Sequence, residues 1–342
     1  MTGAADRGGR LRLALVGCGA ISDWHATALA AAAPRTIVTA CIDPDPDRAA
    51  VAAARQPDAL VFSSLDEALA SDTFDAVDLM VPHHLHEELA TASFAAGKHV
   101  LLEKPMAPTL DACDRILTAA RAAGTVFMVA ENAQYWPEVL TAQQLLVDGA
   151  IGELVTARAW HCFPPFGDFY AGDDPWRFAL AAAGGGIAID AGSHWLRPLR
   201  MWCGELTEVV AVTGRPLAAM EGESMCRALC RFDSGVVASF DAFLVPGAVA
   251  NVPLFQLTGT VGEITIDGLG RVRLFDGTDS KGTVVGQGNY LLSYEGEMAD
   301  FEAAVLDGRA PAAPAEYALG ELRGALAMYR SAEAGAWEPV WE

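Results

Sequence analysis

The sequence predicts an α/β protein: an N-terminal Rossmann domain with a doubly wound parallel sheet, and a C-terminal α+β domain built on a large, mainly antiparallel open sheet. Over the first 130 residues, short apolar runs alternate with helical segments six times. A glycine-rich turn joins the first run to the first helix. From about residue 207, alternating runs are separated by turn dipeptides. We place the domain boundary between residues 131 and 132, giving domains 1–131 and 132–342.

Composition excludes several classes of function. The net charge of −21 argues against nucleic acid and anionic membranes as partners. The densest early apolar run, residues 26–33, is too short to span a bilayer. Seven scattered cysteines without a C-x-x-C motif indicate reduced thiols in a cytoplasmic protein and no metal site. The first ten residues are polar and glycine-rich, and we expect them to be disordered.

The first strand, residues 11–16, leads through a glycine turn into a helix over residues 23–33. Gly17 permits the tight turn, and Gly19 lets a pyrophosphate approach the helix N-terminus, where free N–H groups favour an anion. The third position of the motif is Ser22 instead of Gly or Ala, which is still small enough for close packing. The residues predicted to hold the cofactor here are Gly17, Gly19, Ala20 and Ile21.

The second strand, residues 36–42, ends at Asp43, near the spacing of a ribose-binding carboxylate. Asp43 would accept hydrogen bonds from the ribose hydroxyls, and together with Asp45 and Asp47 it would repel a 2′-phosphate. The sequence therefore predicts NAD in preference to NADP. The alternative is an ordinary turn aspartate before Pro44.

The remaining elements of this domain follow the same alternation. They are expected at 48–55 (helix), 59–62 (strand), a helix capped by Ser64, 75–81 (strand), 87–96 (helix ended by Gly97), 99–102 (strand), 110–123 (helix) and 125–130 (strand). After the fourth strand come Pro82, His83 and His86, which we expect to line the nicotinamide end of a cofactor cleft. Metal binding and plain helix-start polarity are the alternatives.

Glu103-Lys104-Pro105 follows the fifth strand. Lysine is rare here, with three among 23 basic residues. A lysine ammonium can donate a proton or place one compact charge near a ligand, whereas arginine stays protonated. The carboxyl ends of parallel strands are where such sheets bind ligands. The alternative for Lys104 is a surface turn.

The second domain opens with a helix over 137–148 and a strand over 153–161. An irregular stretch, residues 162–183, is rich in aromatic rings, which indicates a functional lid or simple packing. The helix that follows Gly184–Gly186 runs to about 202. It is expected to carry Asp190 and His194 on one face, as an acid–base pair or as a structural hydrogen bond. Six alternating runs and two helices, 295–306 and 315–334, complete the domain.

Three motifs occur in one order: Gly17-x-Gly19-x-x-Ser22, Glu103-Lys104-Pro105, and Gly185-Gly186-x-x-x-Asp190-x-Gly192-x-His194. With these motifs the sequence resembles the Gfo/Idh/MocA oxidoreductases. The motifs and the segments between them extend the resemblance over nearly the whole chain. The resemblance implies a nicotinamide cofactor that also contacts Glu103 and Lys104, and a homodimer or homotetramer formed through the open sheet. It casts Lys104, Asp190 and His194 as catalytic, with His194 moving the proton, and adds Trp176 and Arg177 as substrate contacts. His83 stands where many members have asparagine.

The implied function is hydride transfer between nicotinamide and a secondary alcohol or ketone of a sugar, cyclitol or related ring. His194 would be the base, with Asp190 orienting it or binding a substrate hydroxyl, and Lys104 would polarise the reacting oxygen. Two alternatives stay open: a glycosidase that uses NAD for transient oxidation, and a catalytically silent sensor of sugar or cofactor.

Overall fold

The computed structural model describes residues 9–165, 168–170, 175–247, 252–277 and 279–342. Most of the segment expected to be disordered, residues 1–8, therefore lies outside the described residues. The chain forms two compact units. One runs to Glu131 and takes in Tyr294–Leu319; the other comprises Asn132–Ser293 and Gly320–Glu342.

The predicted division assigned residues 294–319 to the second domain, whereas in the structure they belong to the first compact unit. Arg35, which precedes the second strand, forms ion pairs with Glu302 at 3.3 Å and with Asp307 at 2.6 Å. Thr36 adds a hydroxyl hydrogen bond to Glu302 at 2.7 Å. The C-terminal part of helix α9 (Tyr290–Asp307) is therefore fixed to the first unit by partners more than 260 residues away in the chain.

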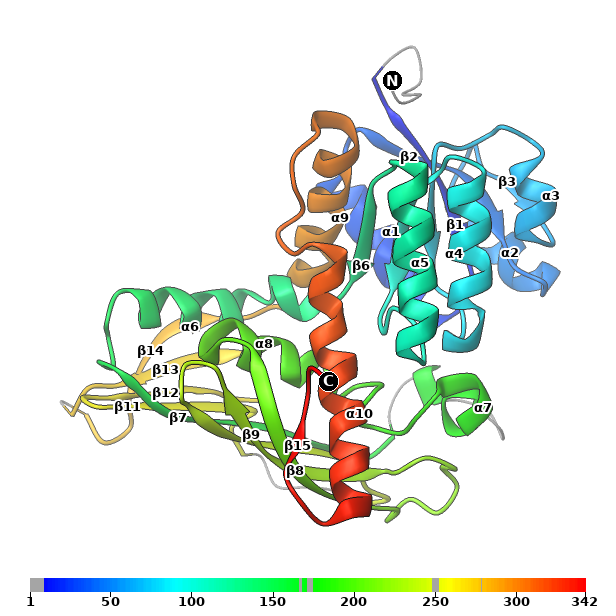
Figure 1. The fold of residues 1–342 in the computed structure, drawn as a ribbon. Coiled ribbons are helices and arrows are strands. Elements are labelled where there is room, and N and C mark those ends of the chain that lie inside the picture. The colour runs from blue at the N-terminus through cyan, green and yellow to red at the C-terminus, as the bar shows by residue number, and fades with distance from the viewer. Residues whose placement is uncertain (1–8, 166–167, 171–174, 248–251, 278) are drawn as a thin grey trace. The chain divides into compact units, whose positions relative to one another are not determined.

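The first unit is the predicted doubly wound parallel sheet (Figure 1), with strand order β3-β2-β1-β4-β5-β6. Its strands are β1 (Leu11–Val16), β2 (Thr36–Ile42), β3 (Leu60–Phe62), β4 (Ala76–Leu79), β5 (His99–Glu103) and β6 (Phe127–Ala130). Its helices are α1 (Ala20–Ala32), α2 (Pro46–Ala53), α3 (Leu65–Leu69), α4 (His86–Ala95) and α5 (Leu110–Ala123). The order reverses between β1 and β4, so the topological switch point lies there.

Local capping explains where these helices begin and end. Thr109 accepts the Ala112 N–H at the start of α5, and Gly124 ends that helix with φ 66°. Ser64 caps α3, but the Glu67 carboxylate accepts the N–H of Ser63 and not that of Ser64, so half of the predicted capping box forms.

The second unit contains a nine-stranded sheet in the order β14-β13-β12-β11-β7-β10-β9-β8-β15. Only the β7–β10 pair is parallel among the recorded pairings, as expected for a mainly antiparallel sheet. The strands are β7 (Leu154–Phe163), β8 (Leu206–Gly214), β9 (Met225–Phe232), β10 (Val237–Leu244), β11 (Phe255–Gly259), β12 (Glu263–Ile266), β13 (Arg271–Phe275), β14 (Thr283–Gln287) and β15 (Glu338–Pro339). The two strands at the ends of this order, β14 and β15, were not predicted.

Helices cover one face of this sheet (Figure 1). Helix α6 (Pro137–Val147) packs on β13 and β14, and α8 (Ser193–Cys203) packs on β7 and β10. Helix α10 (Leu319–Ala334) lies on the same side. In β9, residues Cys226 to Phe232 alternate between buried and exposed side chains, so the opposite face of the sheet is open to solvent in the single chain.

The stretch predicted as irregular, residues 162–183, is more ordered than expected where it is described. Strand β7 extends to Phe163, and three short turns of helix follow: Asp168–Tyr170, Trp176–Phe178 and α7 (Leu180–Ala183). Residues 166–167 and 171–174 lie outside the described part of the chain.

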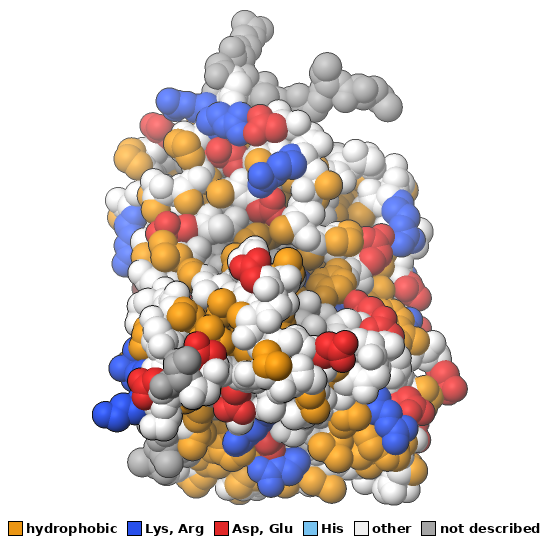
Figure 2. All heavy atoms as spheres, turned by 90° about the vertical axis from the view of Figure 1, so that its left-hand side faces the viewer, with side chains coloured by type: hydrophobic (Ala, Val, Ile, Leu, Met, Phe, Trp, Pro, Cys, Tyr) orange, Lys and Arg blue, Asp and Glu red, His pale blue; other side chains and the backbone are white. Residues whose placement is uncertain are grey.

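Figure 2 shows one side of the molecule. Acidic and basic side chains are interspersed there among hydrophobic ones, and neither sign of charge forms a large continuous patch. Of the helices in the described residues, none combines the length and the apolar character required to cross a membrane.

Candidate active site

The glycine turn at the end of β1 is shaped by two different needs. Gly17 has φ 88°, and a Cβ there would lie 2.3 Å from the carbonyl oxygen of Met80. It is therefore required by the protein itself. Gly19 is extended, with φ −86°, and a Cβ on it would have no protein atom within 4 Å. The open space beside Gly19 is the room that a pyrophosphate requires.

Helix α1 begins at Ala20, three residues before the predicted start, because Gly19 acts as its N-cap. The N–H groups of Ala20 and Ile21 therefore belong to the first turn, where an α-helix supplies no intrahelical acceptor. Ser22 is buried and its hydroxyl donates to the carbonyl of Gly19 at 2.7 Å. The serine in place of the usual third glycine or alanine is thus satisfied within the turn.

Asp43 ties the turn to the end of β2. Its two carboxylate oxygens accept the N–H groups of Cys18 and Asp45, each at 2.8 Å. The side chain of Asp45 in turn caps α2. Asp43 is only 6% exposed, but each carboxylate oxygen has a second lone pair that a ribose hydroxyl could use. These residues fit the adenosine and pyrophosphate of a dinucleotide.

The loop after β4 is fixed to the loop after β5 by His86. Its ring nitrogens face the carbonyl oxygens of Pro105 and Val81, each at 2.9 Å. The His83 ring stands edge-on to it at 5.5 Å, and both rings are buried. His86 therefore shapes the loop between Pro82 and α4 and does not offer a free nitrogen to a cofactor. That is a narrower role than the sequence suggested.

Glu103 ends β5 and is anchored on both sides. Its Oε1 lies 3.1 Å from Nε2 of His25, and its Oε2 accepts the backbone N–H of Lys104 at 3.0 Å. His25 was not singled out from the sequence, since it lies among the alanines of α1 and its partners are distant in the chain. A polar ring one turn after a glycine motif was the available signal.

In the second unit, Arg177 and Asp190 form an ion pair at 3.4 Å between Nε and Oδ2. The Arg177 guanidinium also lies over the Trp176 ring, 4.4 Å from its centroid. Asp190 is buried, and the neighbouring Tyr170 hydroxyl has its pKa raised by its own burial and by the Asp190 charge. The three predicted substrate contacts Trp176, Arg177 and Asp190 thus form one cluster.

The prediction that Asp190 and His194 share a helix face is wrong, because α8 begins at Ser193. Asp190 lies in the coiled turn before it, where its N–H bonds to the carbonyl of Gly186 and its own carbonyl accepts the Ser193 hydroxyl. His194 lies in the first turn of the helix, with its ring 6.1 Å from that of Trp136.

Close packing of backbone explains the glycines of this turn. A Cβ on Gly186 would lie 2.0 Å from the carbonyl oxygen of Glu223, and one on Gly192 would lie 2.6 Å from that of Ala188. The Glu223 carboxylate accepts the Ala188 N–H at 2.9 Å and the Tyr329 hydroxyl at 2.8 Å. Burial raises the pKa of Glu223. Gly186 thus lets the turn pack against Glu223, and Gly192 lets the turn close on Ala188.

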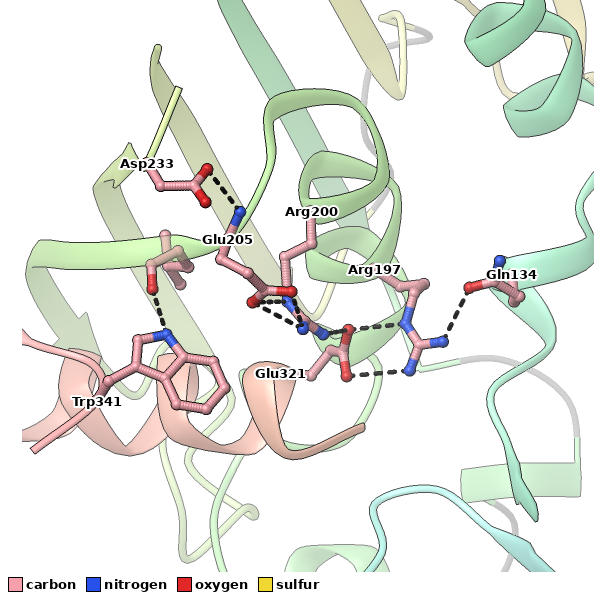
Figure 3. Close-up of polar contacts among 8 residues, drawn as sticks. Gln134, Arg197, Arg200, Glu205, Asp233, Glu321 and Trp341 are labelled. Atoms are coloured by element: carbon pink, nitrogen blue, oxygen red, sulfur yellow. Dashed lines mark hydrogen bonds and ion pairs between the residues drawn. The ribbon is translucent and has the colours of Figure 1, made fainter. Parts of the chain in front are cut away.

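Ion pairs of two arginines anchor α8, the helix that also carries His194 (Figure 3). Arg197 donates to Glu321 of α10 at 2.7 and 3.1 Å and to Gln134 at 3.0 Å. Arg200 contacts the same Glu321 and also Glu205. The two buried guanidinium groups face one buried carboxylate, Glu321, and one partly exposed carboxylate, Glu205, so their charges are paired and the helix that carries His194 is anchored.

The fold and these residues describe a two-domain oxidoreductase with a Rossmann unit. Residues 11–131 match the description "Oxidoreductase family, NAD-binding Rossmann fold", and residues 139–265 match "GFO/IDH/MocA C-terminal domain". The chain belongs to the Gfo/Idh/MocA oxidoreductase family, and its N-terminal unit is the NAD-binding domain.

The relatives include a reductase and a dehydrogenase that are named for sugars. The 1,5-anhydro-D-fructose reductase of Ensifer adhaerens is 30% identical over 284 residues, covering 80% of this chain and 82% of that protein. Levoglucosan dehydrogenase of Pseudarthrobacter phenanthrenivorans is 29% identical over 292 residues, covering 75% and 73%. The structure of GenD2 from gentamicin A biosynthesis, in complex with NAD, superimposes with a TM-score of 0.83 at 28% identity, covering 96% of each chain.

Proposed function

We propose that this protein is an NAD-dependent dehydrogenase or reductase that acts on a secondary alcohol or ketone of a sugar, cyclitol or related ring. The observation that carries the proposal is the open space beside Gly19 at the N-terminus of α1, with Asp43 held next to it. The relatives named for anhydrofructose, levoglucosan and inositol support a cyclic polyol as substrate.

Bound NAD would supply the hydride acceptor, and the chain's own groups would handle the proton and the charge. His194 takes the hydroxyl proton on a ring nitrogen in oxidation and returns it in reduction. Lys104 donates a hydrogen bond to the oxygen on which negative charge develops. The Arg177–Asp190 pair offers a charged donor and a charged acceptor, which suits neighbouring ring hydroxyls.

We propose that the enzyme is a cytoplasmic homo-oligomer assembled through the open face of its nine-stranded sheet. The seven cysteines stand as free thiols, which suits a reducing compartment. Exposed Val212, Leu229 and Val237 lie on strands β8, β9 and β10 and would be covered in such an assembly.

The test is NADH formation from NAD over a panel of sugars and cyclitols, together with NADH consumption by their keto forms. Net turnover excludes the glycosidase alternative, which regenerates its cofactor. Lys104→Ala and His194→Ala should each reduce turnover by roughly a hundredfold or more, the scale of losing a positioned acid–base or electrostatic group.

Matched controls are Lys281→Ala, an exposed lysine, and His99→Gln, a histidine at the start of β5. Both should keep turnover. Near-normal turnover in His194→Ala would contradict the proposal and favour the sensor alternative, in which NAD and sugar bind without reaction.

A further inference from the structure

A cluster of ionisable side chains is buried behind Glu103 in the first unit. His25 of α1 is 0% exposed and its two ring nitrogens face two different carboxylates. Nδ1 lies 2.8 Å from Oδ2 of Asp78 on β4, and Nε2 lies 3.1 Å from Oε1 of Glu103 on β5. Asp78 is fully buried as well. The mechanism proposed above uses neither His25 nor Asp78.

We propose that His25 is held as an imidazolium and acts as a positioning residue, fixing the Glu103 carboxylate and through it the main chain at Lys104. The inference rests on the catalytic role proposed for Lys104. It concerns residues of one unit alone, and it assigns a role to a buried histidine that otherwise only costs desolvation energy.

The protonation state is argued from the hydrogen bonds. A neutral imidazole can donate from only one nitrogen, whereas both nitrogens of His25 face carboxyl oxygens, so an imidazolium is the form that donates to two carboxylates. The alternative is a neutral ring that accepts a hydrogen bond from a protonated Asp78: burial raises the pKa of Asp78, and the His25 charge and hydrogen bond oppose that shift. Burial alone would favour the neutral ring. The charges and hydrogen bonds of Asp78 and Glu103 outweigh it, and the pKa of His25 is raised well above its usual range.

Two side chains of α9 also lie near His25. The Tyr294 ring of α9 lies 5.5 Å from the His25 ring. Glu297, one turn further along α9, is 0% exposed, and its carboxyl oxygens find no hydrogen-bond partner among the described residues. Burial, with the nearby charges of Glu103, Asp78 and Glu131, raises the pKa of Glu297 well above its usual range. Burial therefore favours the neutral acid form of Glu297.

The cluster thus joins one cation to two carboxylates, of which Glu103 reaches the edge of the sheet. Its second oxygen accepts the Lys104 N–H at 3.0 Å. From the other side, His86 holds the Pro105 carbonyl at 2.9 Å. Without His25, Glu103 would lose its buried charge partner, and either its protonation or its rotation would release the Lys104 amide.

The first readout is the NMR signature of the histidine ring nitrogens, measured without cofactor or substrate and assigned by the loss of one pair of signals in His25→Gln. At about pH 8, ordinary histidines are neutral. We expect His25 still to show two protonated nitrogens. Asp78→Asn or Glu103→Gln should lower its pKa by about one unit or more, since each removes a charged partner. A neutral His25 at that pH in the wild type would overturn the inference.

The second readout uses the three lysines of the chain. Isotope-labelled dimethylation of their amino groups gives one NMR signal each, for Lys98, Lys104 and Lys281. The Lys104 signal should shift in Glu103→Gln and His25→Gln and stay in place in His99→Gln, which alters the opposite end of β5. Glu103 is partly exposed, so its variant keeps the test valid if His25→Gln does not fold.

An unchanged Lys104 signal in Glu103→Gln would overturn the positioning role. Turnover separates this inference from the proposed function. If the two spectra behave as expected, we expect His25→Gln to reduce kcat about tenfold or more with a smaller change in KM, since orientation is lost and not binding contacts. If the spectra are as expected but Lys104→Ala keeps full turnover, the catalytic role proposed for Lys104 is contradicted, whereas the positioning of Glu103 by His25 is not.

Discussion

The Asp43 carboxylate accepts the backbone N–H of Cys18 at 2.8 Å, so the residue that follows β2 fixes the glycine turn that follows β1. The same carboxylate therefore carries the negative charge next to the proposed ribose site and holds the glycine turn in shape. An Asp43 oxygen that receives a ribose hydroxyl cannot move away from a 2′-phosphate without breaking this bond.

We therefore predict that NAD binds at least about tenfold more tightly than NADP, the scale of placing a phosphate beside an unpaired carboxylate. Asp43→Asn should weaken NAD binding and reduce the ratio between the affinities for NAD and NADP. Titration calorimetry measures both affinities, with exposed Asp58→Asn as the control. Comparable binding of NAD and NADP by the wild type would contradict the prediction.

Gly19 gives a sharper test of the cofactor turn. Its φ of −86° suits any residue, and a Cβ would meet no protein atom. Gly19→Ala should therefore change the free energy of unfolding by less than about 1 kcal/mol, since helix-cap and chain-entropy effects nearly cancel. NAD affinity should fall by tenfold or more, because the methyl group fills the pyrophosphate space. An alanine variant with full NAD affinity would place the phosphates elsewhere.

Gly186 predicts the opposite pattern. Its missing Cβ is needed by the Glu223 carbonyl at 2.0 Å. Gly186→Ala should lower the free energy of unfolding by about 1–3 kcal/mol, the usual cost of overpacking. Denaturant unfolding measures this, and Gly247→Ala, where a Cβ has open space, is the control. Equal stability of the two variants would show that the turn can shift without strain.

Local signals in the sequence were sufficient for most of the fold. Helix α5 has its predicted bounds because Thr109 and Gly124 mark both ends chemically. The Asp190 prediction failed because spacing alone assumed that the helix after Gly186 already included Gly192, whereas Gly192 packs tightly on the Ala188 carbonyl in a turn that precedes α8. The His25 cluster could not be predicted because its partners are 53 and 78 residues away. Pairings between distant strands and helices appear only once the fold is known.

The open sheet face predicts self-association. Leu229 and Val212 are 46% and 57% exposed on neighbouring strands, and Arg227 lies over the Phe243 ring with its guanidinium 5.4 Å from the centroid. Leu229→Glu should shift the protein toward monomer, because an ionised carboxylate would be buried at the interface. Light scattering at micromolar concentration measures this. Val147→Glu, at the exposed C-terminal end of α6, is the control, and a monomeric wild type would contradict the prediction.

Buried Glu297 predicts that stability falls as pH rises. Burial and the nearby acids raise its pKa in the folded protein, whereas the unfolded chain ionises it near the usual value of 4.5. Above that value the folded state holds one more proton than the unfolded state, so stability decreases as pH rises, by about 1.4 kcal/mol per pH unit per proton. The loss continues until pH passes the raised pKa.

Other buried ionisable groups also change the stability of the protein with pH. The pKa values of Glu223 and Glu138 are raised by burial and add to the same slope. His25 also adds to it, because stability from a raised histidine is complete below its unfolded pKa and is lost as pH passes the folded one. Burial lowers the pKa values of His86 and His99, which reduces stability only at lower pH, below about 6.5, the usual histidine value.

The prediction is therefore tested between about pH 7 and pH 8.5, where unfolded histidines are mostly neutral. The wild-type Tm should fall across this range. In Glu297→Gln a neutral amide replaces a neutral acid, so the Tm near pH 7 should change little and the fall with pH should be shallower. Glu295→Gln, two residues away on the same helix and partly exposed, should keep the wild-type slope. If Glu297→Gln keeps that slope too, Glu297 is ionised in the folded protein and the assignment of a neutral acid is wrong.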